Sequence, residues 1–235
     1  NITTAANTVT LYAGDSIIHN TGFTVSTTTS GAVTYKAGVN FAGAVEAAGN
    51  AGGSIEMADG STVNSAGAVV MSAPGSIQLS TVTAATTVGM TADDNTFALG
   101  NNVGAITEVL TGEAANITGT TVTLSAATGI GSAEDINTSA TTLNATNSTS
   151  GNIVIEEADG VDISGLTTSA GDGSVTVTTT AGSITTSGTI SANGAGGVTL
   201  TAGGAANSIT VNNPILSGSG AVQLTAANGV TLSGA

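Results

Sequence analysis

The chain repeats a short alternation of apolar and polar residues that is typical of β-strands. Its clearest copies are residues 153–165 and 222–234, which align without a gap. In both copies the apolar residues fall at the same alternating places, so one face of each strand is expected to be buried while Glu, Gln and Thr point outward. Asp159-Gly160 and Asn228-Gly229 occupy the same place in the two copies, and such dipeptides favour turns. Each copy therefore predicts a strand, a turn and a second strand.

The strand starts recur with a short and nearly constant period. Ile153, Val175, Val198 and Val222 follow one another at intervals of 22, 23 and 24 residues, and earlier starts are spaced less regularly. A unit this short cannot enclose a core alone, so each unit must stack on its neighbours. The repeat predicts an all-β, right-handed parallel β-helix (β-solenoid) of about 22–24 residues per coil, running as one continuous segment over residues 1–235.

Two segments fit the repeat less well. Residues 91–119 include Asp93-Asp94, a Gly- and Asn-rich cluster, and an apolar stretch at 106–110 for which a short helix is one interpretation. We expect an irregular insertion there. Residues 138–151, rich in Thr, Asn and Ser, are expected to form an irregular coil or an exposed excursion. Because the repeat is already under way at Asn1 and is interrupted at Ala235, we expect a fragment of a longer repetitive chain.

The composition narrows both the fold and the classes of partner. Hydrophobic residues make up 40% of the chain and charged residues 7%, which is not the composition of a disordered segment. Aromatic residues are only 2%, too few for the bulky facing sheets of immunoglobulin-like sandwiches, the alternative all-β architecture. The core is therefore expected to be narrow and lined by Val, Ile, Leu and Ala.

Charge and special residues exclude further functions. Lys36 is the only basic residue apart from a single His, against 15 carboxylates and a net charge of −14. We expect no nucleic-acid partner, because that binding depends on Lys and Arg. No apolar run reaches the ~20 residues of a membrane helix, so we expect no membrane insertion. The chain has no Cys, which excludes disulfides and thiolate metal sites. His19 has no Ser-His-Asp context and is expected at the surface or an edge.

The densest group of carboxylates is Glu156, Glu157, Asp159 and Asp162. Alternation places Glu156 and Asp162 outward, with Glu157 and Asp159 at the corner, which indicates a solvated edge rather than the paired carboxylates of a glycoside hydrolase. We therefore predict no catalytic residue and no enzyme activity. Clustered carboxylates suit Ca²⁺, so these four residues are the candidate metal ligands. No cofactor other than Ca²⁺ is expected.

Three phrases carry a resemblance to a known family: GVTLTAGG at 197–204, GSITTSGTISA at 182–192 and AVQLTA at 221–226. They resemble repeats of the large filamentous-haemagglutinin-like bacterial exoproteins, and the likeness covers most of residues 120–235. The resemblance implies export to the bacterial cell surface or the medium, a rod-like β-helix, and a part in adhesion, aggregation or biofilm cohesion. No functional residue of the family transfers to this chain.

These observations lead to three hypotheses. The first is a non-enzymatic stalk or filament segment of a secreted or cell-surface bacterial adhesin, whose partner is a cell-surface or glycan receptor. The second is a self-assembling extracellular fibre or surface-layer subunit, in which copies associate end to end or side by side, bridged by Ca²⁺. The third is a β-helical enzyme that degrades polysaccharides.

Overall fold

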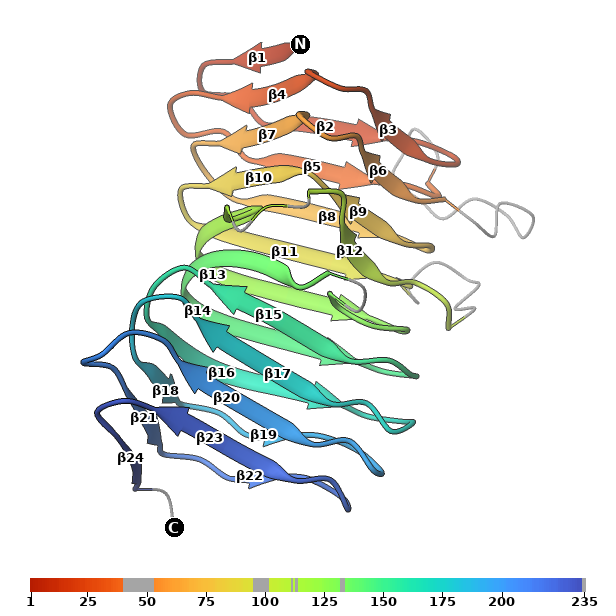
Figure 1. Ribbon diagram of the computed structural model, residues 1–235. Helices are drawn as coiled ribbons and strands as arrows, with labels where there is room; N and C mark the ends of the chain where they lie inside the picture. Colours follow the sequence, from red (N-terminus) through yellow and green to blue (C-terminus); the bar gives the residue numbers. More distant parts are fainter. Residues whose placement is uncertain (40–52, 95–101, 111, 113, 132–133, 234–235) are drawn as a thin grey trace.

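The structure is a computed structural model that describes residues 1–39, 53–94, 102–110, 112, 114–131 and 134–233. In these residues the chain forms strands and no helix, and every strand pairs with its neighbours in parallel (Figure 1). The strands wind into an all-β parallel β-solenoid of about nine turns, which confirms the fold class predicted from the repeat. Parallel pairing also excludes the immunoglobulin-like sandwich, whose sheets are antiparallel.

Each of the N-terminal coils contributes one strand to each of three sides, A, B and C. Side A comprises β3 (Ile17–His19), β6 (Ile55–Met57), β9 (Ile77–Leu79) and β12 (Ile106–Glu108). Side B comprises β1 (Ile2–Thr4), β4 (Thr24–Thr27), β7 (Thr62–Ser65) and β10 (Thr81–Ala84). Side C comprises β2 (Val9–Tyr12), β5 (Val33–Lys36), β8 (Val69–Ala73) and β11 (Thr87–Ala92).

Longer strands occupy the middle of the rod. They are β13 (Ile117–Ala126), β14 (Ile136–Asn147) and β16 (Val161–Thr168). We call the coils from β12 to β16 the waist. One side of the C-terminal coils comprises β15 (Ile153–Glu157), β17 (Val175–Thr179), β20 (Val198–Ala202) and β23 (Val222–Ala226). The remaining strands are β18 (Ile184–Thr186), β19 (Ile190–Ser191), β21 (Ser208–Val211), β22 (Ile215–Leu216) and β24 (Gly229–Leu232).

One inward column of aliphatic side chains runs the length of the rod. Its members are successive partners in register: Ile17, Ile55, Ile77, Ile106, Ile130, Ile153, Val175, Val198 and Val222. All are buried except Val222, which is 45% exposed in the last coil. The column includes the four strand starts that defined the sequence period, so each interval of 22–24 residues corresponds to one coil. Stacked aliphatic side chains supply the narrow core that the composition indicated.

Sides A and B fuse into one side at the waist. In the coil of β9 and β10, Ile77 and Val82 lie in separate short strands. The two inward columns that pass through these residues reach Ile153 and Glu157 respectively. Ile153 and Glu157 lie in the same straight strand, β15. The corner between sides A and B has therefore disappeared.

Side C divides in compensation. β14 and β16 shift register between Leu143 and Asn144, which leaves Ser164 as an extra residue on β16. Beyond this bulge, the single side continues as two strands, because β16 pairs with both β18 and β19. Glycine suits position 165 at the bulge, because its φ of +158° lies in a range that residues with a side chain rarely adopt. Three strands per coil thus return after the waist, with β17, β18 and β19, but with the corners in different places.

The two segments that fit the repeat poorly contain regular strands. Residues 91–119 include the end of β11, all of β12 and the start of β13, while 95–101, 111 and 113 lie outside the described residues. The helical interpretation of 106–110 is wrong, because Ile106–Glu108 pairs with β9 as a strand. Within 138–151, residues 138–147 belong to β14 and pair with β13, so they are not an exposed excursion, although their pairing with β16 shifts register between Leu143 and Asn144.

Candidate functional site

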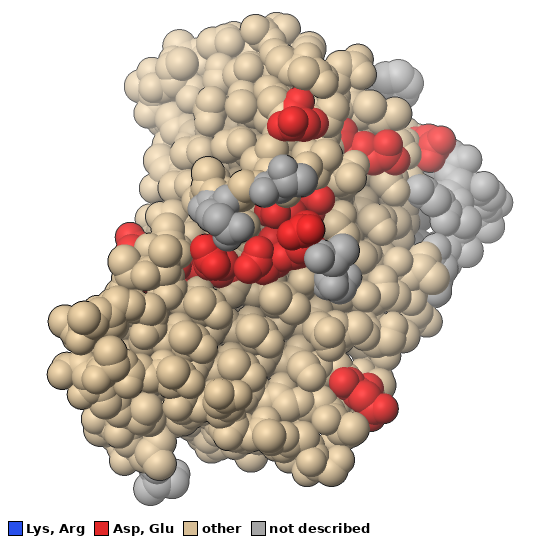
Figure 2. Space-filling view, viewed as in Figure 1, with Lys and Arg blue, Asp and Glu red and all other residues tan. Residues whose placement is uncertain are grey.

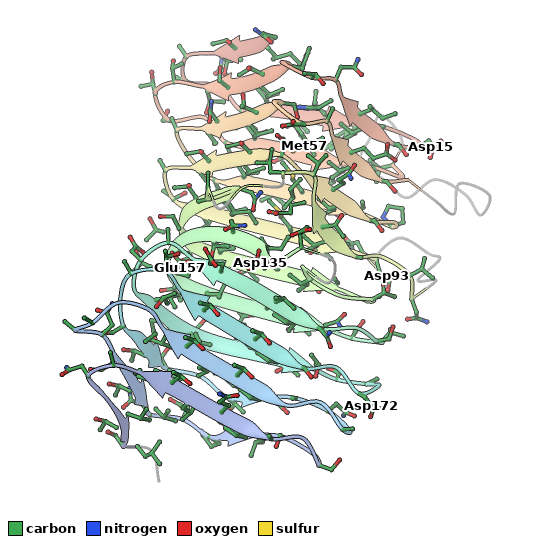
Figure 3. The ribbon with its side chains drawn as sticks, in the orientation of Figure 1. Asp15, Met57, Asp93, Asp135, Glu157 and Asp172 are labelled. Carbon is green, nitrogen blue, oxygen red and sulfur yellow. The ribbon has the colours of Figure 1, made fainter. Side chains whose placement is uncertain are left out.

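The largest group of acidic side chains on the face seen in Figure 2 lies at the waist, and smaller ones lie above it and along the edges. Figure 3 places Glu157 and Asp135 there, whereas Asp15, Asp93 and Asp172 lie along the right-hand edge of the rod. The waist also contains all four predicted metal ligands, so it is the candidate site.

Glu157 is a core residue rather than part of a solvated edge. Its side chain is 0% exposed at the end of β15. Thr138 Oγ1 donates a 2.6 Å hydrogen bond to Glu157 Oε2, and the Ala140 N–H donates to both carboxylate oxygens at 3.0 and 3.1 Å. The prediction that Glu157 lies at a solvated corner is wrong. β15 continues straight past the place where sides A and B met in earlier coils, so Glu157 pairs with Thr138 in the inward column of side B.

The local backbone explains why a carboxylate is buried at this position. β14 continues as one strand through residues 139–141, whereas the chain of the next coil turns here, between β15 and β16. Ala140 therefore has no strand partner in the next coil. A buried N–H without an acceptor would be costly, and Glu157 supplies the acceptor. Burial raises the pKa of Glu157, opposed by the hydrogen bonds from Thr138 and Ala140.

The other three predicted ligands point to different places. Glu156 Oε1 accepts a 3.1 Å hydrogen bond from Thr180, and Asp162 Oδ2 accepts a 2.7 Å hydrogen bond from Ser187. Asp159 is exposed and lines a surface groove. Within the described part of the chain, no group of three or more Asp, Glu, His or Cys side chains is arranged to hold a metal ion. The predicted calcium ligands are thus divided between the core, the groove and the surface.

The groove crosses four successive coils and includes Ala140, whose N–H donates to Glu157. It has a volume of about 290 Å³ and is lined by small and hydroxyl-bearing residues: Ala84, Ala85, Thr118, Gly119, Thr120, Ser139, Ala140, Thr141 and Asp159. Asp159 is the single carboxylate in this lining. Two-carboxylate glycoside hydrolysis needs a second one facing the same bond. The groove can accept hydrogen-bonding groups, but its lining does not provide an acid–base pair.

A second polar group at the waist surrounds Glu108, at the end of β12. Asn137 N–H donates a 2.8 Å hydrogen bond to Asn116 Oδ1 beside it. Glu108 Oε2, Asn116 Nδ2 and Asn137 Oδ1 are buried without a hydrogen-bond partner. Burial raises the pKa of Glu108, and nearby Asp135 acts in the same direction, while the two asparagine amides oppose them. Neither Asn residue was singled out from the sequence, because nothing in a Thr- and Asn-rich chain distinguishes a buried Asn from an exposed one.

His19 is also in the core, so the expectation that it lies at the surface is wrong. It is 2% exposed, its Nε2 lies 2.9 Å from Tyr35 Oη, and its ring packs edge-on against Phe23 with centroids 5.3 Å apart. Burial lowers the pKa of His19. The alternation contained the signal: His19 occupies the inward place that Met57 occupies in the next coil.

The last coil leaves part of the core open. A hollow of about 470 Å³ is lined mainly by aliphatic residues: Val211, Asn213, Pro214, Ile215, Val222, Leu224 and Leu232. Here the inward columns of the solenoid meet solvent.

No family model, curated protein or solved structure matches this chain. The fold classifies it. The chain is a parallel β-solenoid. None of the described segments forms a helix with the length and apolar character needed to cross a membrane.

Proposed function

We propose that this β-solenoid is a structural rod segment of a secreted or cell-surface bacterial adhesin or filament. In this role the rod holds a binding surface away from the cell and contributes to adhesion, aggregation or biofilm cohesion. It performs no catalysis, and its external partner is a cell-surface or glycan receptor.

The observation that carries the proposal is the unbroken inward column from Ile17 to Val222. The column passes through the waist although the corners of the coil change there. Side chains and backbone pairs thus stack along one axis, so adding coils adds length without adding a new core. About nine coils at a spacing of ~4.8 Å correspond to a rod of about 43 Å. The length of the rod is therefore proportional to the number of coils, which suits a protein that holds a binding surface at a set distance.

Two further points support the proposal. Residues 120–235 resemble filamentous-haemagglutinin-like exoproteins, whose rods act in adhesion. The groove at the waist has Asp159 as its one carboxylate, which fits polar contact better than two-carboxylate hydrolysis.

The rod role can be tested by the distance at which the chain holds an epitope from the membrane. One copy or two tandem copies of the chain are displayed on a cell surface, each with the same small epitope at its tip. We expect the epitope to lie farther from the membrane with two copies, by about 43 Å if the copies stack coaxially. Beads coated with the chain should also be retained on cells or on glycans of a panel. An epitope that lies no farther out with two tandem copies than with one would contradict the rod role.

Catalysis is tested separately with a sensitive reducing-sugar assay on the same glycan panel. We expect no turnover. Turnover that is lost in Asp159→Asn and kept in the surface control Glu56→Gln would overturn the non-enzymatic part of the proposal and leave the rod measurement intact.

A further inference from the structure

The charges of this chain are confined to one part of the sequence. Residues 173–235 contain no Asp, Glu, Lys, Arg or His, so all 15 carboxylates and Lys36 lie within residues 1–172. Because coils stack in sequence order, this division becomes a division of the rod. Figure 2 shows the result: the lower part of the molecule carries no charged side chain in this view beyond Asp172 at its edge.

The uncharged part presents a regular face on β17, β20 and β23, which lie side by side in Figure 1. Outward side chains form two columns, Thr176–Thr199–Gln223 and Thr178–Thr201–Thr225, with partners in register. We call these six residues the threonine face. Glu156 occupies the second column in the preceding strand, β15, so the face begins where the carboxylates end.

We propose that the threonine face binds the same face of a second copy of this chain, with the two rods antiparallel. The pair is related by a two-fold axis that runs along β20. Thr199 of one copy then faces Thr199 of the other. Thr178 on β17 of each copy faces Thr225 on β23 of the other copy. Such an interface is self-complementary because both copies contribute the same patch.

Electrostatics favours this face and this direction. Two copies with a net charge of −14 repel each other, and the repulsion is smallest where the uncharged ends overlap. Antiparallel rods place their charged parts at opposite ends of the pair. Parallel rods would instead set the acidic waists side by side, where Glu156 of each copy borders the face.

The surface chemistry fits a second copy as well. Both faces have the same coil spacing of ~4.8 Å, so columns on the two faces match over their whole length. Threonine offers a methyl group for packing and a hydroxyl that both donates and accepts, which allows hydrogen bonds between facing ladders. The inference adds lateral pairing to the proposed rod, and the rod role does not depend on it.

Sedimentation equilibrium of the purified chain tests the association. We expect a reversible dimer whose dissociation constant falls as NaCl is raised, because salt screens the repulsion between the charged parts. Thr199→Glu places two like charges opposite each other on the axis and should weaken the dimer by roughly tenfold or more. The matched control Thr123→Glu adds the same charge at an exposed position on β13 and should leave the dimer unchanged. A monomer at all concentrations would overturn the inference.

A second substitution tests another position on the axis with the opposite charge. Thr201→Lys places a positive charge in the neighbouring column of β20, where each copy again faces itself, and should also weaken the dimer. Leu232→Ser changes the open end of the rod, where Leu232 is 72% exposed, and should have no effect. If Leu232→Ser abolishes the dimer while Thr199→Glu and Thr201→Lys leave it intact, copies associate through the open end and the inference is wrong.

The direction of the rods is tested by cross-linking, which the absence of native Cys makes clean. Facing sheets lie about 10 Å apart, too far for a disulfide, so a bismaleimide of about that length is the suitable reagent. We expect Thr178→Cys protein to cross-link with Thr225→Cys protein far more than with itself, and Thr199→Cys protein to cross-link with itself. Preferred cross-linking of Thr178→Cys protein with itself would contradict the antiparallel arrangement. Scattering of the monomeric Thr199→Glu variant checks that the rod itself is retained.

Discussion

Thr138 and Glu157 face each other in the core of the solenoid, where the Thr138 hydroxyl donates a 2.6 Å hydrogen bond to the Glu157 carboxylate. They are partners in the column that holds Val25, Val63, Val82 and Ile117 in the preceding coils. The column changes from apolar to polar where the corner between sides A and B disappears. Polar groups thus mark the place where the cross-section is rearranged.

Replacement of Glu157 should show how far the waist depends on this acceptor. Glu157→Ala leaves the Ala140 N–H and the Thr138 hydroxyl without their buried partner and opens a cavity, so we expect a loss of about 3 kcal/mol in the free energy of unfolding. Glu157→Gln keeps the volume and one acceptor oxygen, and should cost less than about 1 kcal/mol at pH 7. Urea unfolding followed by circular dichroism measures both. Equal losses for the two variants would show that the acceptor is unimportant.

The pH dependence of stability should reflect two carboxyl groups, the buried Glu157 and the half-buried Glu108. Burial raises the pKa of both Glu108 and Glu157 above the ordinary value of 4.5. Just above pH 4.5 the folded chain therefore holds protons that the unfolded chain releases, and stability rises as the pH falls through the folded pKa values toward 4.5. The double variant Glu108→Gln/Glu157→Gln should lose this dependence.

A control is needed because protonating any carboxylate lowers the net charge. Glu56→Gln/Glu134→Gln removes the same charge from two exposed positions and should keep the slope caused by Glu108 and Glu157. Thermal unfolding midpoints between pH 4.5 and 7 provide the comparison. If the two double variants show the same slope, general charge repulsion accounts for the pH dependence, and Glu108 and Glu157 do not.

The core pair His19 and Tyr35 should behave as a unit. Tyr35→Phe leaves His19 Nε2 without its 2.9 Å partner, and His19→Leu leaves the Tyr35 hydroxyl without one, so each should cost about 1–3 kcal/mol. The double variant removes both buried polar groups and should be less destabilised than the two single losses added together. Additive losses in urea unfolding would contradict the coupling.

Acid should act on His19 in the opposite sense to the carboxyl groups. Because burial lowers its pKa below 6.5, the unfolded chain takes up a proton first as the pH falls, and this part of the stability is lost below pH 6.5. The loss should be absent in the His19→Leu/Tyr35→Phe variant, which thermal unfolding midpoints at pH 7 and pH 5 would reveal. An unchanged difference between these midpoints would exclude His19 as its source.

The sequence pattern predicted the coil well and the waist poorly, for a physical reason. Ile153, Val175, Val198 and Val222 could be aligned because each coil repeats the same local alternation, and stacking conserves that alternation. The exchange of corners depends on which strand of one coil lies above which strand of the next. That relation is not local, so alternation alone placed Glu157 at a solvated corner. His19 is different, since comparison with Met57 in the next coil would have placed it inward.

A substitution at Gly188 tests how closely neighbouring coils pack at the corner formed where side C divides. A Cβ on Gly188, between β18 and β19, would lie only 1.8 Å from the Ser164 carbonyl oxygen, at the bulge where side C divides. Gly188→Ala must therefore push two coils apart, and we expect a loss of at least about 2 kcal/mol, together with faster proteolysis near the waist.

Gly89 provides the matched comparison, because a Cβ there would meet nothing within 4 Å. It lies on β11 between Val70 and Thr123 in an outward column. Gly89→Thr should raise the free energy of unfolding by about 0.5–1 kcal/mol, because a β-branched side chain favours the strand and restricts the unfolded chain. If Gly188→Ala were tolerated as well as Gly89→Thr, the two coils could not lie in close contact at Gly188. The close approach of Gly188 to the bulge at Ser164 would then be wrong, and with it the steric explanation for the exchange of corners.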